Sequence, residues 1–258
     1  MIKLSDQLGN DVVLEHPAKR IVSAVPSQTE LLHYLGLEDE VIGITKFCIH
    51  PNEWFRSKER VGGTKTLNLE KIRLLQPDLI IANKEENSQS DIEELQQEFP
   101  LYLSDIFSFE DAFEMIRDVG TLTGLPEKAS ILTEQIADQI KTFPRLNGRV
   151  LYFMWNEPYM VAGKNTFIGH VLEKIGFENC FSSSDGRYEE ISLERIKELD
   201  PDYLLLSSEP FPFKQEHAEL LKKEINSEVL LVDGEIFSWY GSRMLKMGDY
   251  FKELFTYP

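Results

Sequence analysis

Two segments of this chain, offset by 124 residues, repeat one another. Residues 69–78 read LEKIRLLQPD and residues 193–202 read LERIKELDPD. Each segment follows a residue that favours a helix N-cap, Asn68 or Ser192, then carries apolar residues at helical spacing and reaches a proline that stops the helix. A short apolar run follows each copy, which is typical of a strand buried on both faces. The pattern predicts one helix–turn–strand unit, used twice.

A second matched pair supports a duplicated plan. Residues 32–38 read LHYLGLE and residues 172–178 read LEKIGFE, so both predict a helix end with a C-cap glycine and an apolar residue beyond it. Helix–proline–aspartate–strand is common in α/β proteins, so one copy would say little, whereas two matched phrases in the same order indicate duplication. Strands that alternate with helices favour mostly parallel sheets, and 258 residues suit two domains. The predicted fold class is therefore α/β, in two similar lobes.

A long helix is expected between the lobes. Residues 127–143 show helical apolar periodicity, with Pro126 before them and Pro144 after them, where proline starts or stops a helix. At the usual rise per residue this helix would be about 25 Å long. We therefore predict an N-terminal α/β lobe over residues 1–120, a connecting backbone helix over residues 121–145 and a C-terminal α/β lobe over residues 146–258.

Charge and composition exclude several classes of partner. The net charge of −17 disfavours nucleic acid and anionic membrane surfaces. The two cysteines, Cys48 and Cys180, fall in opposite halves, which excludes a disulfide framework. No run of about 18 apolar residues occurs, so we expect a chain that is not embedded in a membrane. Residues 1–14 lack the apolar stretch of a signal peptide, so a native start at Met1 would imply a cytoplasmic protein.

Candidate ligand-binding residues follow the predicted strands. In parallel α/β sheets, ligands bind outside the carboxyl ends of the strands. The first half places there Pro26, Ser27, Lys46, Cys48, His50, Thr64, Lys65, Glu85 and Asn87. The second half places there Trp155, Asn156, Arg187, Tyr188, Trp239, Tyr240 and Arg243. Aromatic faces with a few polar donors suit a large planar or macrocyclic ligand.

Some of these residues have a simpler interpretation. Trp155 and Trp239 each follow a predicted strand, and each could close a local core instead of forming a ligand wall. Glu85 belongs to a run of polar residues that either lines the predicted ligand edge or forms a solvated loop. Both interpretations stay open for these positions.

Metal binding and catalysis have little support in the sequence. Cys48 and His50 form a C-x-H pair that could coordinate cobalt, iron or zinc, but the alternative is a buried thiol and a histidine at a helix start before Pro51. The other histidines do not converge on strand ends, so we predict no intrinsic metal or cofactor. The chain also lacks the G-x-S-x-G, GxxxxGK[ST] and GxGxxG motifs, so we predict a binding protein rather than an enzyme.

Several segments carry a resemblance to a known family. Residues 61–70, VGGTKTLNLE, and the PDLIIA that follows at residues 77–82 resemble the periplasmic binding proteins for vitamin B12, ferric siderophores and haem. RIVSAVPSQTE at residues 20–30, the phrase at residues 191–202 and WYGSR at residues 239–243 are similar to the same family. The resemblance covers nearly the whole chain and is strongest to the B12-binding branch. It implies two Rossmann-like lobes bridged by one long helix, with the ligand in the cleft between them.

The resemblance also implies a function and a partner. It indicates a monomeric, periplasmic substrate-binding protein of an ABC importer, whose ligand is a corrinoid or an iron chelate. Glu70 and Glu194 stand at matching positions, where glutamates of the family dock onto arginines of the permease dimer. The alternative for this pair is local, because a carboxylate in the first helical turn is favoured by the helix dipole at about 0.3–1 kcal/mol.

The chain departs from the B12-binding branch at the ligand walls. Thr64 and Tyr188 stand where the B12 receptor has tryptophans, so one of two aromatic walls is absent. A cytoplasmic tetrapyrrole or cobamide carrier without a permease is one alternative function on the same fold. An enzyme of unknown chemistry is another.

Overall fold

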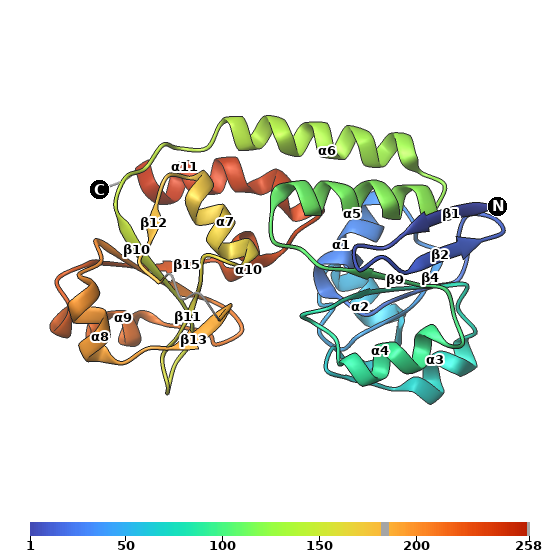
Figure 1. Ribbon diagram of the computed structural model, residues 1–258, viewed down its shortest axis with the longest axis horizontal. Coiled ribbons are helices and arrows are strands. Elements are labelled where there is room, and N and C mark those ends of the chain that lie inside the picture. Colours follow the sequence, from blue (N-terminus) through green and yellow to red (C-terminus); the bar gives the residue numbers. More distant parts are fainter. Residues whose placement is uncertain (182–185, 257–258) are drawn as a thin grey trace. The chain divides into compact units, whose positions relative to one another are not determined.

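The chain packs into two compact units that each contain one main β-sheet. The computed structural model describes residues 1–181 and 186–256 (Figure 1). The first unit comprises Met1–Ile106, Glu110–Ala137 and Tyr240–Arg243, and the second comprises Phe107–Phe109, Asp138–Trp239 and the chain from Met244 onwards. The lobes expected over residues 1–120 and 146–258 stay a prediction as independent domains.

The first unit is built on a five-stranded parallel sheet with the order β5-β4-β3-β8-β9. The central strands β3 and β8 are buried at every residue, which explains why each is apolar up to its last residue, Ser23 or Asn83. The strands are β3 (Ile21–Ser23), β4 (Val41–Ile44), β5 (Glu59–Arg60), β8 (Leu79–Asn83) and β9 (Leu101–Ser104). Figure 1 shows α3 and α4 on one side of this sheet and α5 on the other. The helices are α1 (Pro26–Leu35), α2 (Asn52–Ser57), α3 (Leu69–Leu75), α4 (Gln89–Gln96) and α5 (Phe109–Leu122).

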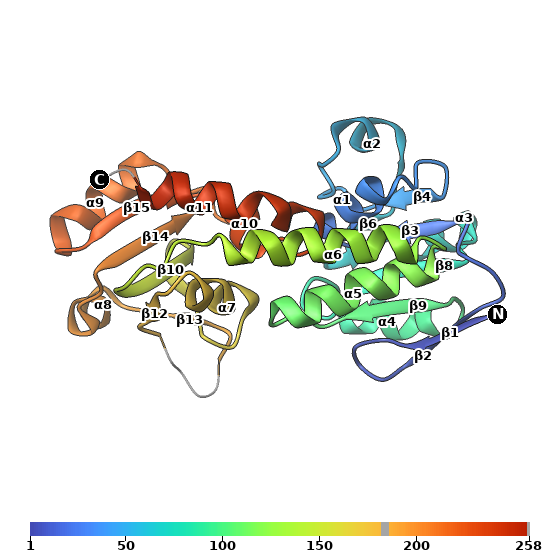
Figure 2. The ribbon, with the colours of Figure 1, turned by 90° about the horizontal axis from the view of Figure 1, so that it is seen from above.

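Two small hairpins complete the first unit. The antiparallel pair β1 (Ile2–Ser5) and β2 (Asp11–Leu14) lies beside β9 (Figure 2), where the Gln7 side chain accepts a hydrogen bond from the Asp105 backbone N–H at 3.0 Å. The second hairpin joins β6 (Gly62–Gly63) to β7 (Thr66–Leu67), so Thr64 and Lys65 form its two-residue turn. This turn is one of the loops that carry predicted ligand-binding residues.

The second unit contains a mixed sheet with the order β13-β11-β10-β14-β15, and β12 pairs with β10. Strands β12, β10, β14 and β15 run parallel, whereas β11 is antiparallel to both β10 and β13. The strands are β10 (Arg149–Trp155), β11 (Met160–Ala162), β12 (Glu178–Asn179), β13 (Tyr188–Glu190), β14 (Tyr203–Ser207) and β15 (Glu228–Val232). The helices are α7 (Phe167–Lys174), α8 (Leu193–Leu199), α9 (Gln215–Glu224), α10 (Gly234–Ser238) and α11 (Met247–Thr256), and η1 (Ser242–Lys246) is a short 3-10 helix.

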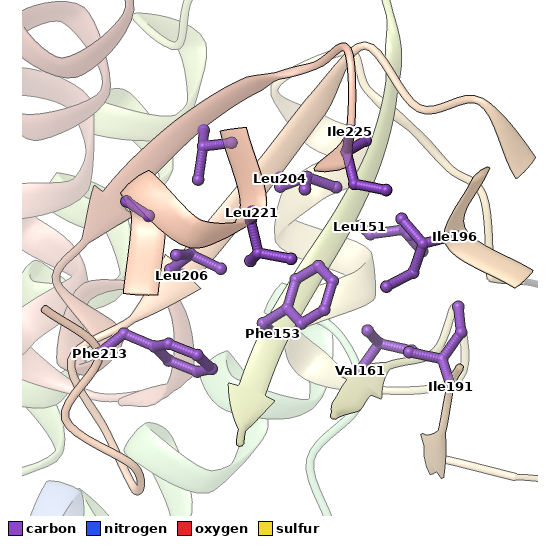
Figure 3. Close-up of a cluster of buried hydrophobic side chains, with 12 residues drawn as sticks. Leu151, Phe153, Val161, Ile191, Ile196, Leu204, Leu206, Phe213, Leu221 and Ile225 are labelled. Atoms are coloured by element: carbon purple, nitrogen blue, oxygen red, sulfur yellow. The ribbon is translucent and has the colours of Figure 1, made fainter. Parts of the chain in front are cut away.

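The core of the second unit lies between this sheet and helices α8 and α9. Figure 3 shows Phe153 of β10 among apolar side chains from the neighbouring elements, including Leu206 of β14 and Leu221 of α9. Val161 and Ile196 close the cluster toward β11 and α8. Strands β10 and β14 are buried on both faces, and alternate residues along each of them contribute to this cluster.

The duplicated phrase forms the same structure twice. Asn68 accepts a hydrogen bond from the Lys71 N–H at 3.0 Å and begins α3, and Ser192 accepts one from the Arg195 N–H at 3.1 Å and begins α8. Each helix has seven residues and ends in a left-handed residue, with a φ of 46° at Gln76 and 45° at Asp200. The predicted repeat of helix, turn and buried strand is confirmed.

The aspartate after each proline ties the turn to the strand beside it. The Asp78 carboxylate accepts the backbone N–H groups of Lys19 and Arg20, each at 2.8 Å, just before β3. The Asp202 carboxylate accepts the Arg149 N–H at 2.7 Å, at the start of β10. The arginine donates in return, since Arg20 bonds the Gln76 carbonyl and Arg149 bonds the Asp200 carbonyl, both at 3.1 Å. The proline–aspartate pair thus sets the register of the central strands in both units.

The helix expected over residues 127–143 is α6 (Pro126–Lys141), which begins at the predicted proline. None of the described helices is long and apolar enough to cross a membrane.

Candidate functional site

The carboxyl edge of the first sheet brings together the loops after β3, β4 and β8. Pro26 and Ser27 form the first turn of α1, and Ser27 is buried there. Lys46 begins the loop after β4, and Glu85 belongs to the loop after β8. Lys65 donates a hydrogen bond to the Glu85 carbonyl, so the hairpin turn is joined to the β8 loop. Most of the residues predicted for the first half therefore lie along one edge.

Asn87 holds this edge together from within. Its side chain is buried, and its carbonyl oxygen accepts the Asn83 N–H at 2.9 Å. Its amide nitrogen donates to the carbonyls of Ala24 at 3.2 Å and Thr64 at 3.0 Å. Asn87 was predicted as a ligand contact, and the geometry shows a residue that positions three loops.

A buried polar network behind the edge was missed by the sequence analysis. Asn83 accepts the N–H groups of Glu85 at 2.9 Å and Glu86 at 3.1 Å, and its amide nitrogen donates to the Ser104 carbonyl at 3.1 Å. Gln28, fully buried in α1, donates to the Ser104 hydroxyl at 2.6 Å. A polar residue at the end of an otherwise apolar strand was the available signal, because such a residue must find partners once it is buried.

Apolar side chains project from the loop after β4. Phe47 is 51% exposed and Ile49 is 46% exposed, while Cys48 between them is fully buried. The Lys46 amine lies 5.0 Å from the centroid of the Phe47 ring. Lys46, Cys48 and His50 were predicted from this loop as ligand-binding residues, whereas Phe47 and Ile49 were not. The alternation of inward and outward side chains explains why the two sets differ.

Cys48 and His50 differ in burial. The Cys48 thiol forms hydrogen bonds with the hydroxyls of Thr29 and Thr45, both at 3.1 Å. Burial raises the pKa of this thiol. His50 is only partly buried and precedes α2. A thiol kept protonated is a poor metal ligand. Among the described residues, no group of three or more His, Cys, Asp or Glu side chains could hold a metal ion.

Trp155 and Trp239 were treated alike by the sequence analysis and differ in the structure. Trp155 ends β10, is 42% exposed, and lies edge-on to Phe211 at 5.9 Å between ring centroids. Trp239 is 8% exposed, and its indole N–H donates to the Glu209 carboxylate at 2.9 Å. The prediction that Trp239 follows a strand is wrong, since α10 lies between β15 and Trp239. Trp155 is therefore available to a ligand, whereas Trp239 is held in place.

Tyr240 and Arg243 require a correction. Both were predicted at the carboxyl edge of the second half, but they pack within the first unit. Arg243 donates to the Glu30 carboxylate of α1 at 2.7 Å, and both side chains are largely buried. An ion pair of this burial fixes the segment on α1, because separating the partners would leave a charge desolvated.

Arg187 lies beside a pocket of the second unit. Its guanidinium stacks on the Phe107 ring, 3.8 Å from the centroid. Both residues line a pocket of about 540 Å³ with Lys164, His170 and Glu173. Asn156 follows Trp155 directly, and Tyr188 begins β13. The roles predicted for Arg187, Asn156 and Tyr188 stay predictions.

Glu70 and Glu194 occupy the same helical position, the second residue of α3 and of α8. The Glu70 side chain is 86% exposed and pairs with Arg73 at 3.0 Å. Glu194 is also exposed, and hydrogen bonds from its own backbone N–H and from the Ser192 hydroxyl lower its pKa. Both carboxylates are therefore presented to solvent at matching places.

The fold and the sequence together define the family. The model of the periplasmic binding protein family matches residues 21–231, and this chain belongs to that family. The vitamin B12-binding protein of Vibrio campbellii is 31% identical over 198 residues, which cover 74% of this chain and 71% of that protein. An uncharacterized ABC transporter substrate-binding lipoprotein of Bacillus subtilis, YvrC, is 29% identical over 217 residues, covering 79% of this chain and 68% of that one.

Solved structures share the fold. The periplasmic vitamin B12-binding protein BtuF of Vibrio cholerae superposes with a TM-score of 0.75 at 23% identity, covering 92% of this chain and 98% of that one. The haem-binding protein HutB of Vibrio cholerae gives a TM-score of 0.77 at 22% identity, covering 93% and 99%. The predicted family and the α/β fold class are confirmed.

Proposed function

We propose that this chain is the substrate-binding protein of an ABC importer and that it captures a corrinoid or an iron chelate. The observation that carries the proposal is a pair of exposed aromatic side chains at carboxyl edges of parallel strands. Phe47 supplies one in the first unit and Trp155 the other in the second. Aromatic faces of this kind bind the flat surface of a macrocycle or chelate. The B12-binding relatives support the corrinoid as the first ligand to test.

The polar residues at the same edges suit the periphery of such a ligand. Lys46 and Lys65 in the first unit bring positive charge to a protein of net charge −17. Cations and amide donors at the rim would pair with carboxylate or amide substituents of the ligand. The family consists of binding proteins for transport, and we extend this to binding without chemical turnover here.

The proposed partner is an ABC permease dimer, and docking would take place at the outer face of the cytoplasmic membrane. The exposed carboxylates of Glu70 and Glu194 would each pair with an arginine of one permease subunit. Changing both residues to glutamine is expected to abolish the salt-sensitive part of docking and leave ligand affinity unchanged. If the double variant docks and transports like the wild type, both carboxylates only stabilise the start of their helices and have no role in docking.

Native mass spectrometry with visible spectroscopy tests the ligand. The purified chain is incubated separately with cobalamin, cobinamide, haem and a ferric siderophore. We expect one of these ligands to form a one-to-one complex with a shifted visible band and to be recovered chemically unchanged. The absence of any complex would contradict the binding function, and a changed ligand mass would point to an enzyme.

A further inference from the structure

Helix α3 carries an apolar side chain on its solvent face. Leu74 is 84% exposed, while Ile72 on the opposite face is fully buried. Leu74 follows Glu70 by four residues, so the two side chains neighbour each other on one helix face. Single exposed leucines are common, so exposure alone carries little. Its position beside the proposed docking carboxylate places this leucine on the surface that would face the permease.

The second copy of the phrase has a different residue at this place. Glu198 stands in α8 where Leu74 stands in α3, four residues after Glu194. Glu198 pairs with Arg195 at 2.8 Å and stays exposed. The solvent face of α3 therefore presents a carboxylate and a leucine, whereas that of α8 presents two carboxylates.

The two docking carboxylates also differ in their neighbours. Arg73 binds Glu70 at 3.0 Å, and it also binds Glu94 at 2.5 Å and Glu98 at 2.6 Å. Within residues 1–181 and 186–256, no lysine or arginine forms an ion pair with Glu194. A permease arginine that approaches Glu70 must share it with Arg73, whereas Glu194 is open to a full charge-assisted pair.

We infer that the two units dock onto the permease by different physical means. The α8 contact is mainly ionic, through Glu194, and the α3 contact is mainly apolar, with Leu74 buried against one permease subunit. This inference rests on the proposed function, because it assigns roles within the same docking surface. A two-fold symmetric permease would thus receive two unequal contacts, and the apolar one would be insensitive to salt.

The test is a docking titration with the permease complex reconstituted in nanodiscs, repeated at several salt concentrations. Leu74→Ser is expected to weaken docking about tenfold, as for loss of a buried leucine side chain, and to leave the salt dependence unchanged. Glu194→Gln is expected to weaken docking about tenfold and to flatten the salt dependence. Glu70→Gln should also weaken docking and flatten the salt dependence, but less than Glu194→Gln does.

A matched control is Ile131→Ser, which removes an exposed apolar side chain from α6, on the opposite side of the first unit from α3 (Figure 1). The control should dock like wild type. The inference is overturned if Leu74→Ser also docks like wild type, if Ile131→Ser weakens docking as much, or if Leu74→Ser changes the oligomeric state of the free chain. The last result would mean that a second copy covers Leu74.

The outcomes separate this inference from the proposed function. If the wild-type chain does not dock at all, the proposed partner fails and the inference fails with it. If the wild type docks, the glutamine variants dock more weakly and Leu74→Ser docks like the wild type, the inference alone is wrong. Normal ligand binding by Leu74→Ser in every case shows that the variant is folded.

Discussion

Helix α3 of the first unit and helix α8 of the second begin, turn and end alike, yet differ in the side chains that face solvent. Both start with a capping side chain and end in a left-handed residue before proline. On the solvent face, Leu74 in one copy corresponds to Glu198 in the other. The backbone is held by local hydrogen bonds that both copies need, whereas an exposed position can change without a cost in stability. Duplication thus conserves the frame and frees the surface for separate roles.

The same contrast holds at the carboxyl edges of the two sheets. The first unit fixes its loops with a buried network around Asn83 and Asn87 and exposes Phe47. The second fixes Trp239 through Glu209 and exposes Trp155. Each unit therefore combines one rigid anchor with one exposed aromatic ring, although different residues supply them.

The largest expected difference between the units concerns their cysteines. Cys48 is fully buried, whereas Cys180 is only half-buried. Burial raises the pKa of both thiols. We expect the first unit to protect Cys48 from Ellman's reagent at pH 8 by at least about a thousandfold relative to Cys180, because reaction requires opening of the fold. The measurement is the two-phase rate of thiol release, with Cys48→Ala and Cys180→Ala assigning each phase.

The raised pKa of Cys48 also predicts a pH dependence with a definite sign. Above the ordinary thiol pKa the unfolded chain loses the Cys48 proton while the folded chain keeps it, so stability falls as the pH rises. Cys48→Ala should remove this part of the decline. An unchanged decline in that variant would assign the effect to other groups.

The buried isoleucines of the repeat test whether the two cores are equally tight. Ile72 and Ile196 are fully buried at matching positions. Each change to alanine is expected to cost about 2–5 kcal/mol of unfolding free energy, and the two costs should be similar. Urea denaturation can report the first unit through Trp54, its only tryptophan, and hydrogen exchange can report the second. Leu74→Ala, at an exposed position, is the control and should cost less than about 0.5 kcal/mol.

The fold was predictable from the sequence where local patterns determine it. In each copy the capping residue, the proline and the apolar run lie within residues 68–82 or 192–206, so a single short segment encodes the whole unit. Arg243 and Glu30 are separated by 213 residues, and their ion pair leaves no local pattern. Sequence reasoning consequently placed Tyr240 and Arg243 in the wrong unit. The family resemblance added the function class, which periodicity alone could not supply.

The exposed aromatic residues test the ligand edge in both units. Phe47→Ala and Trp155→Ala should each weaken binding of the ligand found by mass spectrometry roughly fivefold to twentyfold, with thermal stability nearly unchanged. Trp239→Ala should instead lower the melting temperature, because its ring is buried and hydrogen-bonded to Glu209. Isothermal titration with thermal melts separates the two effects. Equal affinity in the Phe47 and Trp155 variants would remove the ligand-wall interpretation.

The smallest expected effect is at the two helix caps, and it offers the closest match between the units. Asn68 and Ser192 each accept one backbone N–H, at 3.0 and 3.1 Å, and both are exposed to solvent. Replacing either with alanine should cost about 1 kcal/mol, because the orphan N–H loses its partner to water and the first turn frays. Replacing either with glycine should cost only a few tenths of a kcal/mol, since glycine at this position tolerates the extended backbone. The exchanges Asn68→Ser and Ser192→Asn should be close to neutral, because both residue types cap equally well. Hydrogen exchange of the α3 and α8 amides measures each cost in its own unit. If the alanine variant of one copy loses several times more unfolding free energy than that of the other, the two caps do not contribute equally. The repeats would then be equivalent in backbone structure but not in energy.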